Sequence, residues 1–337
     1  MKHVPIARQG GSMSTSVAFS PDVLRLDAAR EAERIEQGIR RIIFDRFRRK
    51  GAVLGLSGGI DSSVTGALCA RALGSERVLG LMMPEAESSS ESRELALELA
   101  AAFGIATAEE DITPLLEASG CYARRDAAIR RVIPEYAAGW KSKIILPDML
   151  ARDRYAVFSI VARSPEGREY RVRLTAEASL ELVAATNFKQ RARKLQEYYH
   201  ADRLQYAVAG TPNRLEYDQG FFVKLGDGAA DLKPIAHLYK SQVYQLAEYL
   251  GIPEAIRKRP PTTDTYSLAQ SQEEFYFSIS LEKMDLCLYG RDHQVPEEEV
   301  AEAIGLEAEQ VARVYRQIES RRKVAEYLLC PPVLIEN

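Results

Sequence analysis

The feature that most constrains the fold is an apolar segment that runs directly into a glycine-rich loop, AVLGLSGGIDSS at residues 52–63. Residues 52–57 have the composition of a short buried strand, and a helical pattern follows from Ser62 to Leu73. Gly58 and Gly59 permit a tight turn between the two elements. A strand, a tight loop and a helix in this order are typical of a parallel α/β sheet.

Strands and helices alternate along much of the remaining chain. Further predicted strands are Arg77–Pro84, Ile105–Ile112 and Leu204–Thr211. Predicted helices are Asp27–Lys50, Ser89–Phe103, Ala176–Tyr199 and Tyr239–Leu250. This alternation predicts an α/β fold with a doubly wound, mostly parallel sheet and flanking helices.

Three segments depart from the alternation. Leu115–Tyr136 has a helical pattern, and Pro296–Leu329 is helical and charged. In Arg154–Leu174, apolar and polar residues alternate on both sides of Ser164–Gly167, which is typical of a β-hairpin. We therefore expect one domain with elaborations. The expected parts are a disordered tail over 1–26, a main domain over 27–290 with a hairpin insertion at about 151–175, and a helical C-terminal extension over 291–337.

The overall composition argues against several classes of protein. The 337 residues carry a net charge of −3, which argues against broad binding of nucleic acid. No apolar run approaches the roughly 20 residues needed to cross a bilayer, and the N-terminus lacks the core of a signal peptide. Cys69, Cys121, Cys287 and Cys330 are scattered, which favours reduced thiols over disulfides or a zinc site. We therefore expect a cytoplasmic protein that binds neither nucleic acid nor membranes.

The glycine-rich loop fits two incompatible interpretations. Residues 55–59, GLSGG, match the G-x-S-x-G elbow that carries the nucleophilic serine of α/β-hydrolases, which would be Ser57. In those enzymes the nucleophile follows several strands of the sheet, whereas only a tail and a helix precede this strand. The histidines that follow are not framed by a recognisable acid. The pattern therefore disfavours a hydrolase.

The same loop has the features of a phosphate-binding site. Gly58 and Gly59 let the backbone approach anionic oxygens closely, and the helix that follows directs free N–H groups toward them. Ser57, Ser62 and Ser63 add hydroxyl donors. The loop lacks the lysine of G-x-x-x-x-G-K-[ST], so it is not a Walker A loop.

Asp61 is the unexpected residue of this loop, because a carboxylate beside phosphate is repulsive. It fits the N-cap of the following helix, and it also fits a ligand of a magnesium ion that bridges the phosphates. The loop sequence leaves both roles open.

The stretch SGGIDSS resembles the pyrophosphate-binding loop of the N-type ATP pyrophosphatases, and other stretches narrow the resemblance to the NAD synthetases. These are MPEAESSSES (83–92), NFKQRAR (187–193), AGTPNRLE (209–216), GFFVKLGDGAADLKPIAHLYKSQVYQLAEYLGIP (220–253) and KRPPTTD (258–264). The resemblance spans roughly Arg34–Asp285, and the stretches follow one another in the order of the family.

The resemblance implies the adenine nucleotide alpha hydrolase-like fold and an ATP-dependent amide ligase. Ammonia-dependent NAD synthetases use ATP and Mg²⁺ to adenylate the carboxylate of nicotinic acid adenine dinucleotide. Ammonia then displaces AMP, and the products are NAD⁺, AMP and pyrophosphate. We find no segment for a glutaminase domain, so we expect free ammonia or a separate glutaminase as the nitrogen source. The resemblance also implies a homodimer with the dinucleotide site near the interface.

The resemblance further implies roles for individual residues. ATP would be bound by Ser57, Gly58, Gly59, Ser62, Ser63, Thr211, Lys240, Thr262 and Thr263. Asp61 and Glu216 would hold magnesium. The dinucleotide would be bound by Asn187, Arg191, Tyr198, Phe221, Lys224, Asp227 and Asp231. The expected catalytic residues are Asp61, Glu216, Lys240 and Asp227, with Asp227 as the candidate to deprotonate ammonium.

Simpler explanations exist for some of these residues. Asn187 and Arg191 lie one helical turn apart and fit an exposed pair, Gly226–Gly228 fits a plain turn, and Glu216 fits a surface carboxylate. The hairpin and the segment Thr263–Ser278 depart from the family pattern. An ammonia-dependent ligase that amidates a different carboxylate is therefore the main alternative. A non-catalytic nucleotide-binding relative is disfavoured because both expected metal ligands are present.

Overall fold

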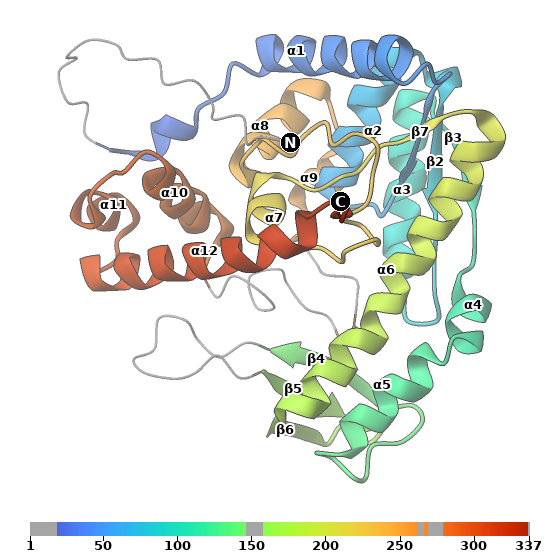
Figure 1. Cartoon of the computed structure of the whole chain (residues 1–337), viewed down its shortest axis with the longest axis vertical. Coiled ribbons are helices and arrows are strands. Elements are labelled where there is room, and N and C mark those ends of the chain that lie inside the picture. Colours follow the sequence, from blue (N-terminus) through green and yellow to red (C-terminus); the bar gives the residue numbers. More distant parts are fainter. Residues whose placement is uncertain (1–18, 146–157, 262–265, 269–278, 336–337) are drawn as a thin grey trace.

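The computed structural model describes residues 19–145, 158–261, 266–268 and 279–335 (Figure 1). Its main sheet has four parallel strands in the order β3-β2-β1-β7. The strands are β1 (Ala52–Gly55), β2 (Val78–Met82), β3 (Ala106–Glu109) and β7 (Ala207–Val208). Val53 of β1 lies opposite Leu79 of β2 on one side and Val208 of β7 on the other.

Helices cover both faces of this sheet, because successive strand residues point to opposite faces. Ala52 and Leu54 share a core with the first helical layer, whereas Val53 shares a core with the second. The first layer contains α1 (Ala28–Arg40), α2 (Ile60–Leu73), α3 (Ser90–Phe103), α8 (Lys240–Leu250) and α9 (Glu254–Lys258). The second contains α4 (Thr113–Ala118), α5 (Cys121–Arg130) and α6 (Ala176–Leu204). The doubly wound fold predicted from the sequence is confirmed.

A second, antiparallel sheet lies below the first in Figure 1, with strand order β4-β5-β6. Its strands are β4 (Lys141–Ile145), β5 (Ser159–Arg163) and β6 (Glu169–Arg173). The hairpin signal predicted β5 and β6, but β4 was missed because its short pattern, KSKII, does not stand out from the turn residues before it. Residues 154–157 of the expected hairpin lie outside the described residues.

The helix α6 joins the two sheets. Its 29 residues extend over about 44 Å at 1.5 Å per residue. Near its start, Ala178 and Leu182 pack against the antiparallel sheet, and further along, Ala192 and Ala201 pack against the parallel sheet. The insertion is therefore connected to the main domain through one continuous helix.

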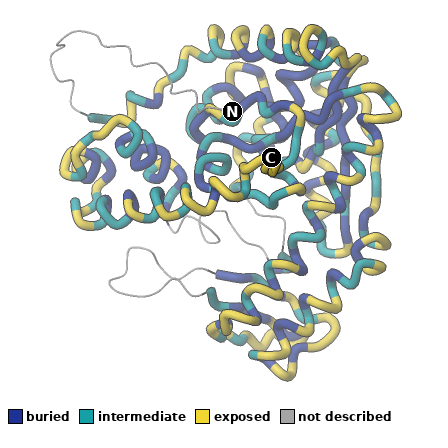
Figure 2. Tube along the Cα trace, viewed as in Figure 1, coloured by how far each residue is buried: buried dark blue, intermediate teal, exposed yellow. Residues whose placement is uncertain are grey.

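The C-terminal helices form a core of their own beside the main domain. They are α10 (Leu281–Asp292), α11 (Glu297–Ile304) and α12 (Ala308–Leu329), and α7 (Arg214–Gln219) packs against them. The expected boundary at residue 290 falls inside α10, whose Met284 and Leu288 share this core with Val300 and Val314. Figure 2 shows the buried sides of α10–α12 turned toward one another.

The first helix ends earlier than predicted. The sequence predicts a helix over Asp27–Lys50, but the α-helix ends at Arg40 and a π-helical turn, η2 (Arg41–Arg46), follows. The N–H of Phe47 donates to the carbonyl of Ile42 at 2.9 Å. The apolar spacing did not reveal the change, because the wider turn still buries Ile43 completely.

Two other predictions are wrong in extent. Leu115–Tyr136 is not one helix, because Gly120 lies between α4 and α5 with a φ of +70° that a right-handed helix does not contain. The strand expected over Leu204–Thr211 has only two residues, since α6 continues to Leu204 and the N–H of Gly210 donates to Leu232 at 2.8 Å.

Part of the segment expected to be a disordered tail is packed. Pro21–Leu24 form a 3₁₀ turn, η1, whose Leu24 is buried in the core of the C-terminal helices. The Gln245 side chain accepts the N–H of Leu26 at 2.9 Å and donates to the carbonyl of Leu24 at 3.0 Å. A second short turn, η3 (Ser75–Arg77), leads into β2. Among the described residues, no helix is both long enough and apolar enough to cross a bilayer.

Candidate active site

A cavity of about 470 Å³ lies at the carboxyl ends of β1, β2 and β7. The loop after each of these strands lines it, and so do one side of α6, the segment Phe221–Val223 and the segment Arg259–Pro261. The carboxyl edge of a parallel sheet is the usual place for a ligand in open α/β folds.

The glycine-rich loop forms one wall of the cavity. Gly58 has a φ of +70°, and a Cβ at this position would lie 2.5 Å from the carbonyl oxygen of Ser92, so the loop needs glycine here. The helix α2 begins immediately afterwards, and the N–H groups of its first turn face this end of the loop. The Ser57 hydroxyl lies 3.1 Å from the Ser62 hydroxyl and accepts the N–H of Gly59 at 3.3 Å. This arrangement provides several hydrogen-bond donors for an anion.

Asp61 does not cap α2, because the N-cap residue is Gly59. Its carboxylate forms an ion pair with Lys240, the first residue of α8, and its Oδ1 accepts the Asn213 side-chain amide at 3.1 Å. The helix-cap interpretation of Asp61 is therefore wrong. Lys240 is only 1% exposed, and the charges of Asp61 and Glu216 hold its pKa above the usual range although burial acts in the opposite direction.

Glu216 lies beside this ion pair and lines the same cavity. Its Oε2 accepts the N–H of Asn213 at 3.1 Å. Burial and the negative charge of Asp61 raise the pKa of Glu216 to about 8. A divalent cation between the two carboxylates would relieve this repulsion, and carboxylate oxygens are suitable ligands for Mg²⁺. Within the described residues, no cluster of three or more acidic, histidine or cysteine side chains forms a metal site, so phosphate or water oxygens would complete the coordination.

The structure brings many of the residues expected from the sequence into this one cavity. Those that line it are Ser57, Gly59, Asp61, Ser62, Thr211, Glu216 and Lys240 from the expected ATP and metal site, and Asn187, Phe221 and Asp227 from the expected dinucleotide site. Gly58 and Ser63 belong to the loop without lining the cavity, and Thr262 and Thr263 lie outside the described residues.

Four residues expected to bind the dinucleotide lie outside the cavity of the single chain. The Arg191 Nε donates to the Lys224 carbonyl at 3.3 Å, and the Lys224 Nζ donates to the Tyr327 carbonyl at 2.8 Å. The Tyr198 hydroxyl donates to Asp231 at 3.4 Å, and Asp231 in turn accepts the N–H of Val208 at 2.7 Å. These four residues, Arg191, Tyr198, Lys224 and Asp231, therefore form a neighbouring surface that runs from α6 to α12.

Comparison with known proteins decides the family. Residues 31–135 and 153–327 match the sequence model of the NAD synthase family. The chain belongs to the NAD synthase family. It is 55% identical over 324 residues to the NH(3)-dependent NAD(+) synthetase of Rhizobium rhizogenes. The aligned region covers 96% of this chain and 98% of the relative. The family predicted from the sequence is confirmed.

Solved structures of low sequence identity share the fold of this NAD synthase family member. The NMN synthetase of Francisella tularensis superposes with a TM-score of 0.62 at 20% identity, over 93% of this chain and 100% of that one. The NH3-dependent NAD synthetase of Campylobacter jejuni gives a TM-score of 0.61 at 23% identity, with the same coverage.

Sequence reasoning missed several charged residues of this NAD synthase site. Arg259 lines the cavity, and its guanidinium donates to the Ser92 hydroxyl at 2.9 Å, next to the loop glycine Gly58. Arg193 also lines the cavity. Both residues lie inside stretches that carry the family resemblance, KRPPTTD and NFKQRAR. Their position in these stretches could have identified them as candidates.

Nothing in the sequence indicated that an ion pair on α6 would be buried in the cavity. Lys194 and Glu197 line the cavity and are joined at 2.6 Å. Burial raises the pKa of Glu197, and burial likewise raises the pKa of Asp227, which accepts the N–H of Val223 at 2.8 Å. This end of the cavity therefore holds two carboxyl groups that take up a proton more readily than an exposed carboxyl does.

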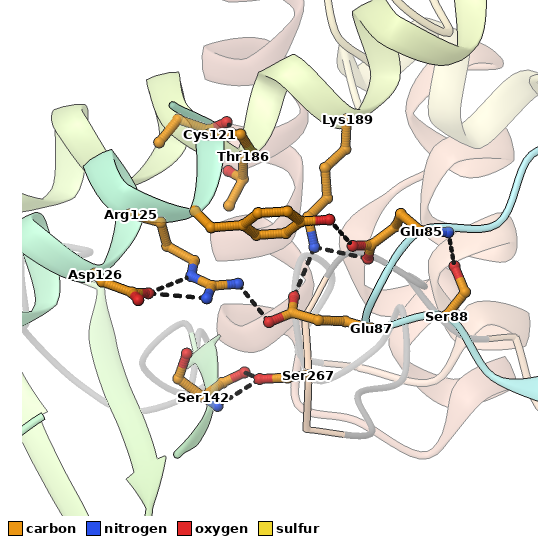
Figure 3. A network of polar contacts seen from close by, with 12 residues as sticks. Glu85, Glu87, Ser88, Cys121, Arg125, Asp126, Ser142, Thr186, Lys189 and Ser267 are labelled. Atoms are coloured by element: carbon orange, nitrogen blue, oxygen red, sulfur yellow. Dashed lines mark hydrogen bonds and ion pairs between the residues drawn. The ribbon is translucent and has the colours of Figure 1, made fainter. Parts of the chain in front are cut away.

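A network of buried charges fixes α6 against the loop after β2 (Figure 3). The side chain of Lys189 has no exposed surface, and its Nζ donates to Glu85 at 2.9 Å and to Glu87 at 2.7 Å. Tyr122 and Arg125 of α5 donate to the same two carboxylates, at 2.6 and 2.5 Å. Burial acts to raise the pKa of Glu87, but Lys189 and Arg125 hold it below the usual range.

This network positions two walls of the cavity relative to each other. Ser88, which lines the cavity, accepts the N–H of Glu85 at 3.0 Å. The neighbours of Lys189 on α6 line the cavity as well, at Asn187, Gln190 and Arg193. The network therefore connects the loop after β2 and α6, which both line the cavity.

We expect Lys189→Met to lower the free energy of unfolding by about 3–5 kcal/mol, because it leaves the buried carboxylate of Glu85 without a cation and removes one of the two cations that bind Glu87. Urea unfolding followed by circular dichroism measures this change. Arg131→Met is the matched control, because Arg131 is 43% exposed in its ion pairs and solvent screens them, so its removal is expected to leave the free energy of unfolding nearly unchanged. Similar losses for both variants would contradict the structural role of Lys189.

Proposed function

We propose that this NAD synthase family member is an ammonia-dependent NAD⁺ synthetase. It uses ATP to adenylate the carboxylate of nicotinic acid adenine dinucleotide, and ammonia then displaces AMP to give NAD⁺. The observation that carries the proposal is a single cavity that joins the phosphate loop and the carboxylate pair of Asp61 and Glu216 to Asn187, Phe221 and Asp227. The close relationship to curated NH(3)-dependent NAD(+) synthetases supports the same reaction.

The ATP half of the reaction takes place at the glycine-rich loop. Backbone N–H groups at the start of α2 and the hydroxyls of Ser57 and Ser62 bind the phosphates. Lys240 and Arg259 place positive charge at the same end of the cavity, where pyrophosphate gains charge as it leaves. Asp61 and Glu216 would hold Mg²⁺, which would supply charge neutralisation at the phosphates.

The carboxylate half takes place beside Phe221 and Asn187. Phe221 packs near the nicotinate ring, and Asn187 offers an amide to the polar part of the dinucleotide. A carboxylate oxygen of the dinucleotide attacks the α-phosphorus of ATP and pyrophosphate departs, so no nucleophile from the protein is needed. The protein accelerates this step mainly by holding the two reactants together in a productive orientation.

Ammonia must be neutral to attack the adenylate. Asp227 lines the cavity, and burial raises its pKa toward the range in which a carboxylate is a more effective base. Asp227 therefore accepts a proton from ammonium before the attack. The nitrogen comes from free ammonia or from a separate glutaminase.

The residues expected to bind the dinucleotide that lie outside the cavity would take part in the site if the protein forms a homodimer. Large apolar side chains are exposed around Arg191 and Lys224, at Leu195 and Tyr199 on α6, at Leu225, and at Val324 and Tyr327 on α12. Burying such a patch is favourable, and packing against a second copy would bring these charged residues next to the bound dinucleotide.

The unpaired cysteine thiols of the protein support a cytoplasmic location. Cys69, Cys121, Cys287 and Cys330 are all free in the structure, and three of them are buried. Unpaired thiols are typical of a reducing compartment.

The direct test is incubation of the protein with MgATP, ammonium and nicotinic acid adenine dinucleotide. We expect NAD⁺, AMP and pyrophosphate in equal amounts, measured by chromatography. With glutamine in place of ammonium, we expect no turnover unless a glutaminase is added. AMP and pyrophosphate without NAD⁺ would contradict the proposed transfer of ammonia to this dinucleotide.

Asp61→Asn and Glu216→Gln test the metal pair. Each removes one anionic ligand, so we expect pyrophosphate release to fall by at least about 10²- to 10³-fold while the fold is retained. Asp202→Asn, an exposed carboxylate on α6, should leave the rate unchanged. Wild-type rates in either site variant would refute the metal assignment.

The homodimer is tested by light scattering of Tyr199→Asp. A charge at the centre of the proposed interface should convert a dimer into monomers. Leu115→Asp, which alters an exposed apolar residue on α4, should leave the dimer intact. A monomeric wild-type protein at working concentration would exclude this arrangement.

A further inference from the structure

Asp285 is a fully buried carboxylate that none of the roles described above uses. It lies on α10 between Met284 and Leu286, which belong to the core of the C-terminal helices. Its two oxygens nevertheless reach the main domain. Oδ1 accepts the N–H of Lys240 at 3.3 Å, and Oδ2 accepts the N–H of Ser241 at 2.8 Å.

These two N–H groups belong to the first turn of α8. The donors of a first helical turn have no partner within the helix, and they carry the positive end of the helix dipole. A cation at this end is unfavourable, yet Lys240 is the first residue of α8 and is almost completely buried. The carboxylate of Asp285 satisfies both donors and offsets the positive charge that collects there.

The side chain of Lys240 extends from this anchored turn to Asp61 in the phosphate loop. A shift of the first turn of α8 would move the ammonium group relative to the loop, because the backbone of Lys240 is bound directly to Asp285. The neutral Gln242 side chain accepts only the N–H of Tyr239, at 3.1 Å, and so does not replace the carboxylate.

We propose that Asp285 is a positioning residue for ATP binding. It fixes the first turn of α8 so that Lys240 faces Asp61 and the phosphates, and it thereby makes the C-terminal helices part of the nucleotide site. The inference rests on the proposed role of Lys240 in binding ATP.

A double-mutant cycle tests the proposal. Titration calorimetry measures the affinity of each full-length variant for MgATP in the absence of the second substrate. We expect Asp285→Asn to weaken ATP binding about tenfold, because the amide keeps the size of the side chain but loses the charge and one acceptor. In the Lys240→Met background the same change should weaken binding less than about twofold. Circular dichroism checks the fold of each variant.

Val314→Ala is the control for general loosening of the C-terminal helices. Val314 of α12 is buried in the core that it shares with Met284 and Leu288 of α10, so the change weakens the packing between α12 and α10. We expect a lower melting temperature with ATP affinity unchanged.

Three results would overturn the proposal. If Asp285→Asn weakens ATP binding equally with and without Lys240, or lowers only the melting temperature, Asp285 does not act through Lys240. That result leaves the proposed function intact. If Lys240→Met itself binds ATP as the wild type does, both the inference and the role of Lys240 in the proposed function are wrong.

Discussion

The buried ion pair between Lys240 and Asp61 connects two parts of the chain that are 179 residues apart, and the candidate site depends on it. A lysine that is 1% exposed is tolerated only with a partner for its charge, because the cost of removing an ammonium group from water is large. The pair therefore fixes the start of α8 against the phosphate loop. Asn213 donates to the carboxylate of Asp61, and Asp285 accepts the backbone N–H of Lys240.

A second buried lysine organises a different wall of the cavity. Lys189 joins α6 to the loop after β2 through Glu85 and Glu87, and α5 contributes Tyr122 and Arg125. Removing Lys189 is costly because the buried carboxylate of Glu85 then has no cationic partner among the contacts of this network. The site thus lies between two charged clusters whose geometry is set by burial, while the apolar cores on the two faces of the sheet hold the supporting strands and helices.

Local patterns predicted most of the fold and part of the site. The strand, glycine loop and helix around Ser57 form a continuous segment, so their arrangement follows from neighbouring residues alone. Element ends were less predictable, because the π turn after Arg40 keeps the apolar spacing and because α6 continues past its predicted end at Tyr199 to Leu204, the first residue of the predicted strand. Asp61 shows the limit within the loop itself. Its sequence position permits a cap, but Gly59 is the N-cap of α2, and the Asp61 side chain pairs with Lys240 of α8.

The sequence by itself determined the parallel α/β fold, the phosphate loop and the family, because each of these depends on short-range order or on stretches that retain their spacing. The tertiary structure decided which residues share the cavity. It added Arg259, Lys194 and Glu197, and it placed Arg191 and Lys224 on a neighbouring surface. Charged side chains have no periodicity that reveals their partners, and whether one is buried depends on elements that approach from elsewhere in the chain.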